Sequence, residues 1–171
     1  MTKQKRGKQK TNKNTKPKHN MSEENNDPLS ADVGDKELTK MPLLPADRLL
    51  RFEIRKPVTA PTKKDPAKNM LTIPCHLVED TRGTDGAVVH KGFPIFMRYT
   101  VTPTEERSAK QIAADIGRLC QALGIKGVKV IDIINDPKTH LDGKIFDAKT
   151  RIVPEKDGYP ESNTLNPVPL A

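Results

Sequence analysis

The stretch from residue 91 to 125 constrains the fold of this 171-residue chain most, because a strand pattern leads directly into a helix pattern. Apolar side chains alternate from Phe93 to Val101, a period of two that is typical of a strand with one buried face. The opposite face carries Phe96 beside Arg98. Pro94 has no amide donor, so it fits the start of a strand or a free edge.

Pro103 ends this strand, and a helix is predicted to follow up to Gly124. Thr104 is one possible N-cap, with two glutamates directly after it, and Ser108 with Gln111 has the form of a capping box. The apolar stripe of this helix consists of Ile112, Ile116, Leu119, Cys120 and Leu123. One helix cannot bury such a stripe alone, so we expect a sheet to cover it.

Gly117 interrupts the predicted helix, where glycine costs about 1 kcal/mol relative to alanine. We expect a neighbouring segment to approach the helix closely at this position.

The charge of the chain is concentrated at its N-terminus. Residues 1–20 hold eight Lys and Arg and no acid, so 22 of the 30 basic side chains remain for the other residues, which hold all 22 acids. The predicted organisation is a disordered basic arm and polar linker over residues 1–42, followed by one domain over 43–171. The arm cations that we consider for nucleic-acid binding are Lys3, Lys5, Arg6, Lys8 and Lys10.

Two other roles for the arm remain open. It could only solubilise the protein, or it could be neutralised by the acidic residues that follow it between positions 23 and 37.

The rest of the chain predicts mainly β structure. Alternating segments at residues 50–54, 70–80 and 146–152 indicate strands, and residues 163–169 could form a last edge strand. Residues 57–68 are predicted as a Pro/Lys loop, 81–91 as a hairpin loop and 128–134 as a short helix. Pro74 suggests that its strand lies at an edge or contains a bulge.

No motif for catalysis, metal binding or a cofactor is present in the sequence. Cys75 and His76 are adjacent, so in a strand they point to opposite faces and cannot easily share a metal. Cys75 and Cys120 indicate buried, reduced thiols, and no apolar run is long enough to cross a membrane. We therefore expect a cytoplasmic protein that is not an enzyme and uses no cofactor or metal.

A surface remains as the candidate site. If the first three strands pair in order, one face presents Arg51, Arg55, His76, Phe96 and Arg98. Cations around an aromatic ring suit a single-stranded nucleic acid, because they neutralise phosphates while the ring stacks on a base. Lys91 and Tyr159 are added to the predicted site as a neighbouring cation and aromatic ring. An ordinary solvated face explains the set equally well. For Phe96 taken alone we favour a place in the core, under the Pro-rich loop or the C-terminal segment.

The order of the elements also carries a resemblance. The segments that carry it are LLPADRLLRFEI, KNMLTIPCHLVED, KGFPIFMRYTV, IGRLCQALGI, LDGKIFDAKTRIV and NTLNPVP, which span residues 43–169. This pattern resembles a phage-encoded family of formerly unknown function that is itself similar to OB-fold proteins that bind single-stranded DNA. The chain departs from many such binders because it ends in NPVPLA rather than in an acidic tail that recruits partners, and because it begins with a basic arm.

The resemblance implies an OB-fold-like antiparallel barrel with one long helix between its third and fourth strands, in the α+β class. An open antiparallel sheet with a packed helix is the alternative fold. The implied function is binding of single-stranded DNA, or of RNA, as a non-catalytic accessory to phage replication or recombination proteins in the host cytoplasm. The alternative function is a phage virion or host-interaction adaptor with a solubilising tail. The sequence sets no oligomeric state.

Overall fold

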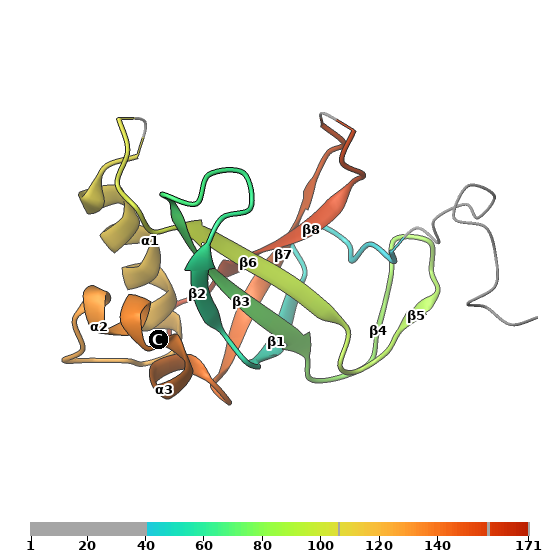
Figure 1. The fold of residues 1–171 in the computed structure, drawn as a ribbon. Helices are drawn as coiled ribbons and strands as arrows, with labels where there is room; N and C mark the ends of the chain where they lie inside the picture. The colour runs from blue at the N-terminus through green and yellow to red at the C-terminus, as the bar shows by residue number, and fades with distance from the viewer. Residues whose placement is uncertain (1–40, 106, 157, 171) are drawn as a thin grey trace, which may run out of the picture. The chain divides into compact units, whose positions relative to one another are not determined.

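The computed structural model describes residues 41–105, 107–156 and 158–170 (Figure 1). The predicted arm and linker, with the five arm cations named above, lie outside the described residues apart from positions 41 and 42. The structure therefore leaves the predictions for the arm untested.

The described chain is mainly β, with three helices. The strands are β1 (Leu49–Ile54), β2 (Val58–Pro61), β3 (Asn69–Leu77), β4 (Thr81–Arg82), β5 (Val88–Val89), β6 (Pro94–Thr100), β7 (Ile145–Val153) and β8 (Ser162–Pro167). The helices are α1 (Ala109–Ala122), α2 (Val130–Asn135) and α3 (Pro137–Leu141). Figure 1 shows the helices gathered at one end of the main sheet and the β4–β5 hairpin at the other end.

The main sheet is built around β3, which has neighbours on both edges. β6 pairs with one edge, while β1 and β2 pair with the other edge one after the other, and β7 and β8 continue outward from β1. The order is therefore β6-β3-β1-β7-β8, and every pair is antiparallel. β8 also lies alongside β6. No ladder joins these two strands in the described part of the chain, so the sheet is not a closed barrel.

A bend separates β1 from β2, and it bears on the predictions for the Pro/Lys loop and for Pro74. Lys56 has a φ of 52°, and its amide donates to Asp142 Oδ1 at 2.6 Å. The bend turns part of the predicted Pro/Lys loop into β2. Pro74 lies in the central strand, so the edge position is wrong, but the alternative of a bulge agrees with the registers. Residues 55–57 of the partner segment face only residues 73 and 74 of β3, and the Pro74 carbonyl accepts from the Arg55 amide at 3.0 Å. A proline is tolerated there because the partner strand changes direction at this point.

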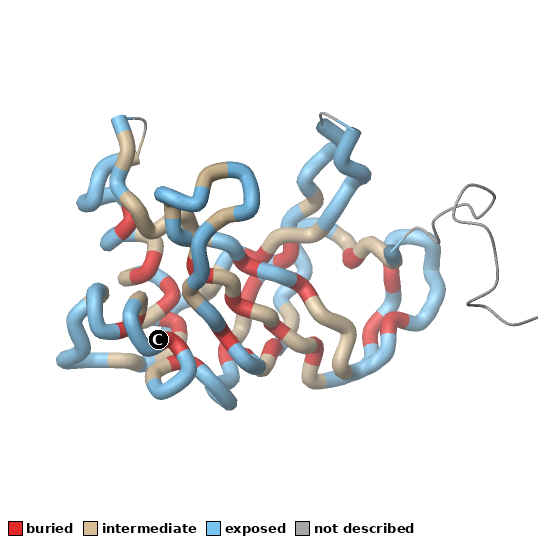
Figure 2. The backbone as a smooth tube through the Cα atoms, viewed as in Figure 1, coloured by how far each residue is buried: buried red, intermediate tan, exposed pale blue. Residues whose placement is uncertain are grey.

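Alternating side chains of the sheet form the core, as the sequence predicts (Figure 2). The inward residues of β3, at positions 71, 73, 75 and 77, are all buried. The rings of Phe52 and Phe146 meet across the β1–β7 pair with 6.2 Å between their centroids. The predicted stripe of α1 completes the core, because Ile112, Ile116 and Leu119 are buried.

The helices differ in part from the prediction. α1 has 14 residues and begins at the capping box, in which Ser108 and Gln111 satisfy each other's backbone amides. The alternative start at Thr104 is wrong, because this residue forms a separate turn with Arg107, and the first turn of α1 holds no acid. Since α2 and α3 follow, the single long helix of the prediction is not found, while the predicted short helix near residues 128–134 is confirmed as α2.

The expectation for Gly117 is wrong. A Cβ atom built on this glycine would have no heavy atom within 4 Å outside its own helix backbone and chain neighbours. No close neighbour therefore requires a glycine at this position.

We predict that Gly117→Ala raises the free energy of unfolding by up to about 1 kcal/mol, because alanine favours the helix and meets no obstacle. Chemical denaturation measures this change. Gly124→Ala is the contrasting variant and should destabilise the protein, because Gly124 has a φ of 65° and its new Cβ would lie 3.2 Å from Leu170 Cδ1. Loss of stability in Gly117→Ala would contradict the position of α1.

A second pair of variants tests which face of α1 is buried. Leu119→Ala should cost about 2–5 kcal/mol of unfolding free energy, because the side chain is fully buried. Arg118→Ala should change stability by less than about 0.5 kcal/mol, because its exposed side chain forms only a surface ion pair with Asp115. Equal effects in urea melts would show that the helix face is assigned wrongly.

Candidate nucleic-acid interface

The predicted surface forms on the side of the sheet that faces away from the core. In the β3–β6 ladder, Pro74 lies opposite Phe96, Thr72 opposite Arg98 and His76 opposite Pro94. In the β1–β3 ladder, Glu53 lies opposite His76. We call this surface the outer face, and it consists of Arg51, Glu53, Arg55, Thr72, Pro74, His76, Phe96 and Arg98. The five residues predicted to share one face are therefore brought together by the structure.

Phe96 is the exposed aromatic ring of this face. Its neighbours Ile95 and Met97 are buried, so the alternation of β6 directs Phe96 to the opposite side, where 41% of the residue is exposed. Our interpretation of Phe96 as a core residue is wrong for this reason. The guanidinium carbon of Arg98 lies 5.4 Å from the ring centroid, within the range of a cation–π interaction. Arg98 forms no ion pair with the residues that the structure describes.

The other two arginines of the outer face are paired with acids. Arg51 binds Asp147 through two hydrogen bonds of 2.8 and 3.2 Å, and Arg55 Nε donates to Glu53 at 2.9 Å. Hydrogen bonding to Arg51 lowers the pKa of the Asp147 carboxyl and raises the pKa of the guanidinium. Much of the positive charge that the sequence suggested is thus compensated. Asp147 was missed because only the β1–β7 register brings it beside Arg51.

His76 is held in place at the end of the outer face. Its Nδ1 lies 2.9 Å from the carbonyl oxygen of Gly92. A carbonyl oxygen only accepts hydrogen bonds, so Nδ1 carries the proton and the ring is held by the turn that precedes β6. Nε2 is the ring atom that remains available for a ligand.

The last two predicted residues lie in connecting segments. Lys91 is in the turn before β6, where its amide donates to Asp80 at 2.7 Å. This bond is the main reason why the pKa of Asp80 is lowered. Tyr159 is exposed in the β7–β8 loop and forms an isolated bridge with Lys156.

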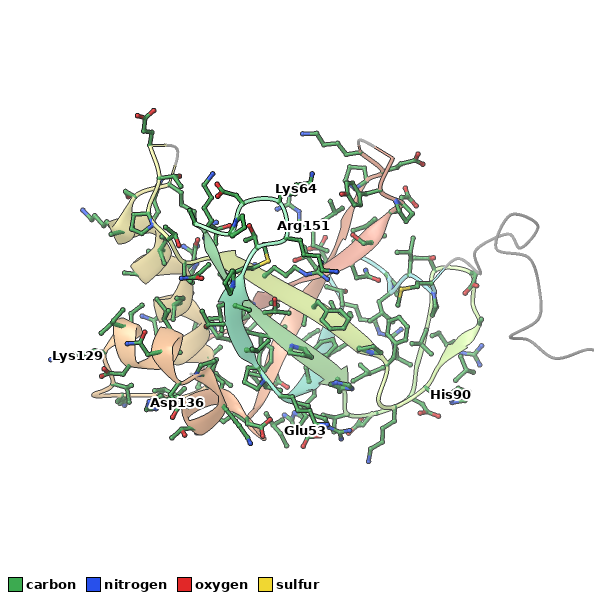
Figure 3. The ribbon with its side chains drawn as sticks, viewed as in Figure 1. Glu53, Lys64, His90, Lys129, Asp136 and Arg151 are labelled. Carbon is green, nitrogen blue, oxygen red and sulfur yellow. The ribbon has the colours of Figure 1, made fainter. Side chains whose placement is uncertain are left out.

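The sequence interpretation overlooked cations near the Arg98 end of the outer face. The ladders place residues 69–72 of β3 between β2 and β6, and the loop that joins β2 to β3 adjoins this end. Lys63 and Lys64 extend from this loop without an ion pair to any described residue, and Figure 3 labels Lys64 there. Lys68 in the same loop pairs with Asp65 at 3.2 Å. The signal in the sequence was the pair Lys63-Lys64 between two prolines, which indicates exposed cations in a loop.

Other kinds of site find little support within residues 41–170. The described residues contain no group of three or more His, Cys, Asp or Glu that could hold a metal ion. Burial raises the pKa of the Cys75 thiol to about 12 and also raises that of Cys120, so both remain protonated at neutral pH. Burial likewise raises the pKa of Tyr99. Among the described helices, none combines the length and the apolar character that crossing a bilayer requires.

Comparison of the chain with protein-family models, with curated proteins and with solved structures gave no match.

The pairing of Arg51 with Asp147 predicts a titration behaviour. The Asp147 carboxyl should titrate below the usual aspartate value of about 3.9, and Arg51→Ala should move its pKa back up toward that value. Because the pKa is lower in the folded state, the stabilisation is complete above the unfolded-state pKa and is lost as pH falls through the folded-state pKa. Carboxyl carbon shifts followed by NMR measure this. Arg55→Ala is the control and should leave the pKa of Asp147 unchanged; no response to Arg51→Ala would contradict the pair.

Proposed function

We propose that this protein is a non-catalytic binder of single-stranded nucleic acid with an OB-fold-like domain. An OB-fold is a five-stranded, partly open Greek-key barrel, and the face of its second and third strands, with two flanking loops, binds oligonucleotides. If β1 and β2 are taken as the two halves of one bent strand, the described sheet has five strands. The helices follow the third of these strands, as the resemblance implies.

The strand order supports this assignment. Counted in this way, β3 and β6 are the second and third strands, and β7 and β8 are the fourth and fifth. β8 lies beside β6 without a ladder, which corresponds to a barrel that is left open at one seam. The β2–β3 loop and the β7–β8 loop then correspond to the two binding loops of the fold. They carry Lys63 and Lys64 in one loop, and Lys156 and Tyr159 in the other.

The observation that carries the proposal is the exposed pair of Phe96 and Arg98 on β6. A ring that is 41% exposed offers a surface for stacking a base, and the neighbouring Arg98 has no carboxylate partner among described residues. The Arg98 side chain can therefore leave the ring for a phosphate at the cost of one cation–π contact only.

The compensated charges of the outer face limit what the folded domain does alone. Two of the three arginines of this face already neutralise carboxylates, so the outer face itself supplies stacking and, in Arg98, one arginine without an ion pair among the described residues. The basic arm of residues 1–20 would supply most of the sequence-independent attraction. An accessory role beside phage replication or recombination proteins follows from the resemblance and belongs to the same proposal. An adaptor with a solubilising arm is the alternative.

Deletion of residues 2–20 should flatten the salt dependence of binding to a single-stranded oligonucleotide. The slope of log K against log salt should fall by at most about 0.7 for each phosphate that the arm neutralises. The preference for single-stranded over duplex DNA should persist. Fluorescence anisotropy at several salt concentrations measures both quantities.

Phe96→Ala should have the opposite effect. Loss of stacking should weaken binding to a single strand by about 1–3 kcal/mol while the salt slope is unchanged. Val88→Ala removes an apolar side chain that is also exposed, in the separate β4–β5 hairpin, and this variant should bind like the unmodified protein. Arg98→Ala is the corresponding test for charge, and Arg82→Ala in the β4–β5 hairpin is its control. Thermal melts show whether each variant is folded.

One result would reject the proposal in favour of the adaptor. The proposal fails if the arm-deleted protein is folded but binds no oligonucleotide at low salt.

A further inference from the structure

A pocket lies where β3 separates from β1, and its position follows from the hydrogen bonds of β1. The even-numbered residues of β1 bond to β7, as the bonds from Thr150 N–H to Arg48 O and from Ile54 N–H to Lys144 O show. The amides and carbonyls of Leu49 and Arg51 therefore point toward β3.

Of the hydrogen bonds that the amides and carbonyls of Leu49 and Arg51 could make, the β3 side supplies one. Val78 N–H donates to Arg51 O at 3.0 Å, and the chain then turns away into β4. Within the described residues, the Arg51 amide and both backbone groups of Leu49 have no partner from that side. The amides of Leu49 and Arg51 are thus two free donors, and the Leu49 carbonyl is one free acceptor, along a short strand edge.

The pocket at this edge has a volume of about 300 Å³. Leu50 and Leu77 supply apolar walls, and Thr81 lies beside them with a buried Oγ1 that makes no hydrogen bond to the described residues. This volume lies at the lower end of the range for small-molecule sites. The pocket combines apolar walls with a few polar groups, as ligand sites do.

The free charges around the pocket balance, because Arg48 and Glu79 both lack an ion pair with any described residue, so the pocket has no net attraction for an anion. Two arginines, Arg48 and Arg51, face three carboxylates, and Arg51 is already bound to Asp147. Asp80 accepts from the Lys91 amide and the His90 ring, whereas Glu79 has no ion pair with any described residue. The free acceptors are therefore the Glu79 carboxylate and the Leu49 carbonyl.

We infer that this pocket is a subsite for an amino-bearing nucleobase, cytosine or adenine, of a strand that lies on the outer face. The inference rests on the proposed function. The exocyclic amine would donate to Glu79 or to the Leu49 carbonyl, and the adjacent ring nitrogen would accept from a backbone amide. In the same orientation, thymine would present its O4 to the carboxylate and its N3–H to the backbone amide, so both contacts would be unfavourable. Arg51 belongs to both the outer face and the pocket lining, so a strand on the face would lie near the pocket.

The first test compares oligo(dC) with oligo(dT) of equal length on the full chain by fluorescence anisotropy. Oligo(dC) should bind at least about fivefold more tightly, the discrimination of one good base contact. Glu79→Gln should bring the ratio close to one, while the control Glu105→Gln, an exposed residue outside the pocket, should leave it unchanged. Equal binding of both oligonucleotides by the unmodified protein would overturn the subsite and leave the proposed function standing.

The second test does not depend on strand binding. Titration of the full chain with dCMP should shift the NMR signals of the Leu49 and Arg51 amides, and dTMP at the same concentration should shift them at least about fivefold less. If oligonucleotides fail to bind but dCMP produces these shifts, the proposed function is wrong and the pocket is retained as a nucleobase site. The absence of dCMP-specific shifts at these two amides overturns the inference.

Discussion

The two-sided pairing of β3 is the interaction on which the rest of the structure depends. This strand joins β6 on one edge to β1 and β2 on the other, so it connects the segments before and after it in the chain. Its inward side chains are the centre of the core, and its outward side chains are the middle row of the outer face. A strand with period two can serve both purposes because alternate side chains are physically separated by the sheet.

The bend at Lys56 determines how the sheet presents its surfaces. It allows one segment to pair with both halves of β3, and it is held by the hydrogen bond from the Lys56 amide to Asp142. Beyond the other end of the β1–β3 ladder the two strands diverge, which leaves the backbone edge of Leu49 and Arg51 at the pocket. The outer face and the pocket are thus consequences of where pairing with β3 begins and ends.

The electrostatics of the outer face combine local and long-range effects. The Arg55–Glu53 pair is local, because residues two apart in an extended chain lie on the same side. The Arg51–Asp147 pair joins segments 96 residues apart and depends on the β1–β7 register. Together they leave Arg98, stacked on Phe96, as the arginine of the outer face without an ion pair among the described residues, which concentrates the proposed binding on β3 and β6.

The sequence by itself determined the strands at β1, β3, β6 and β7, the buried stripe of α1, the capping box of Ser108 with Gln111, and, within each strand, which of the predicted surface residues lie on the same side. These features depend on periodicity and on the spacing of the capping residues, which are local properties of the chain. Only the tertiary structure decided that Phe96 is exposed, that β2 exists and that the sheet stays open between β6 and β8. Each of these depends on which distant segment covers or pairs with a residue, and alternation of side chains carries no information about that partner.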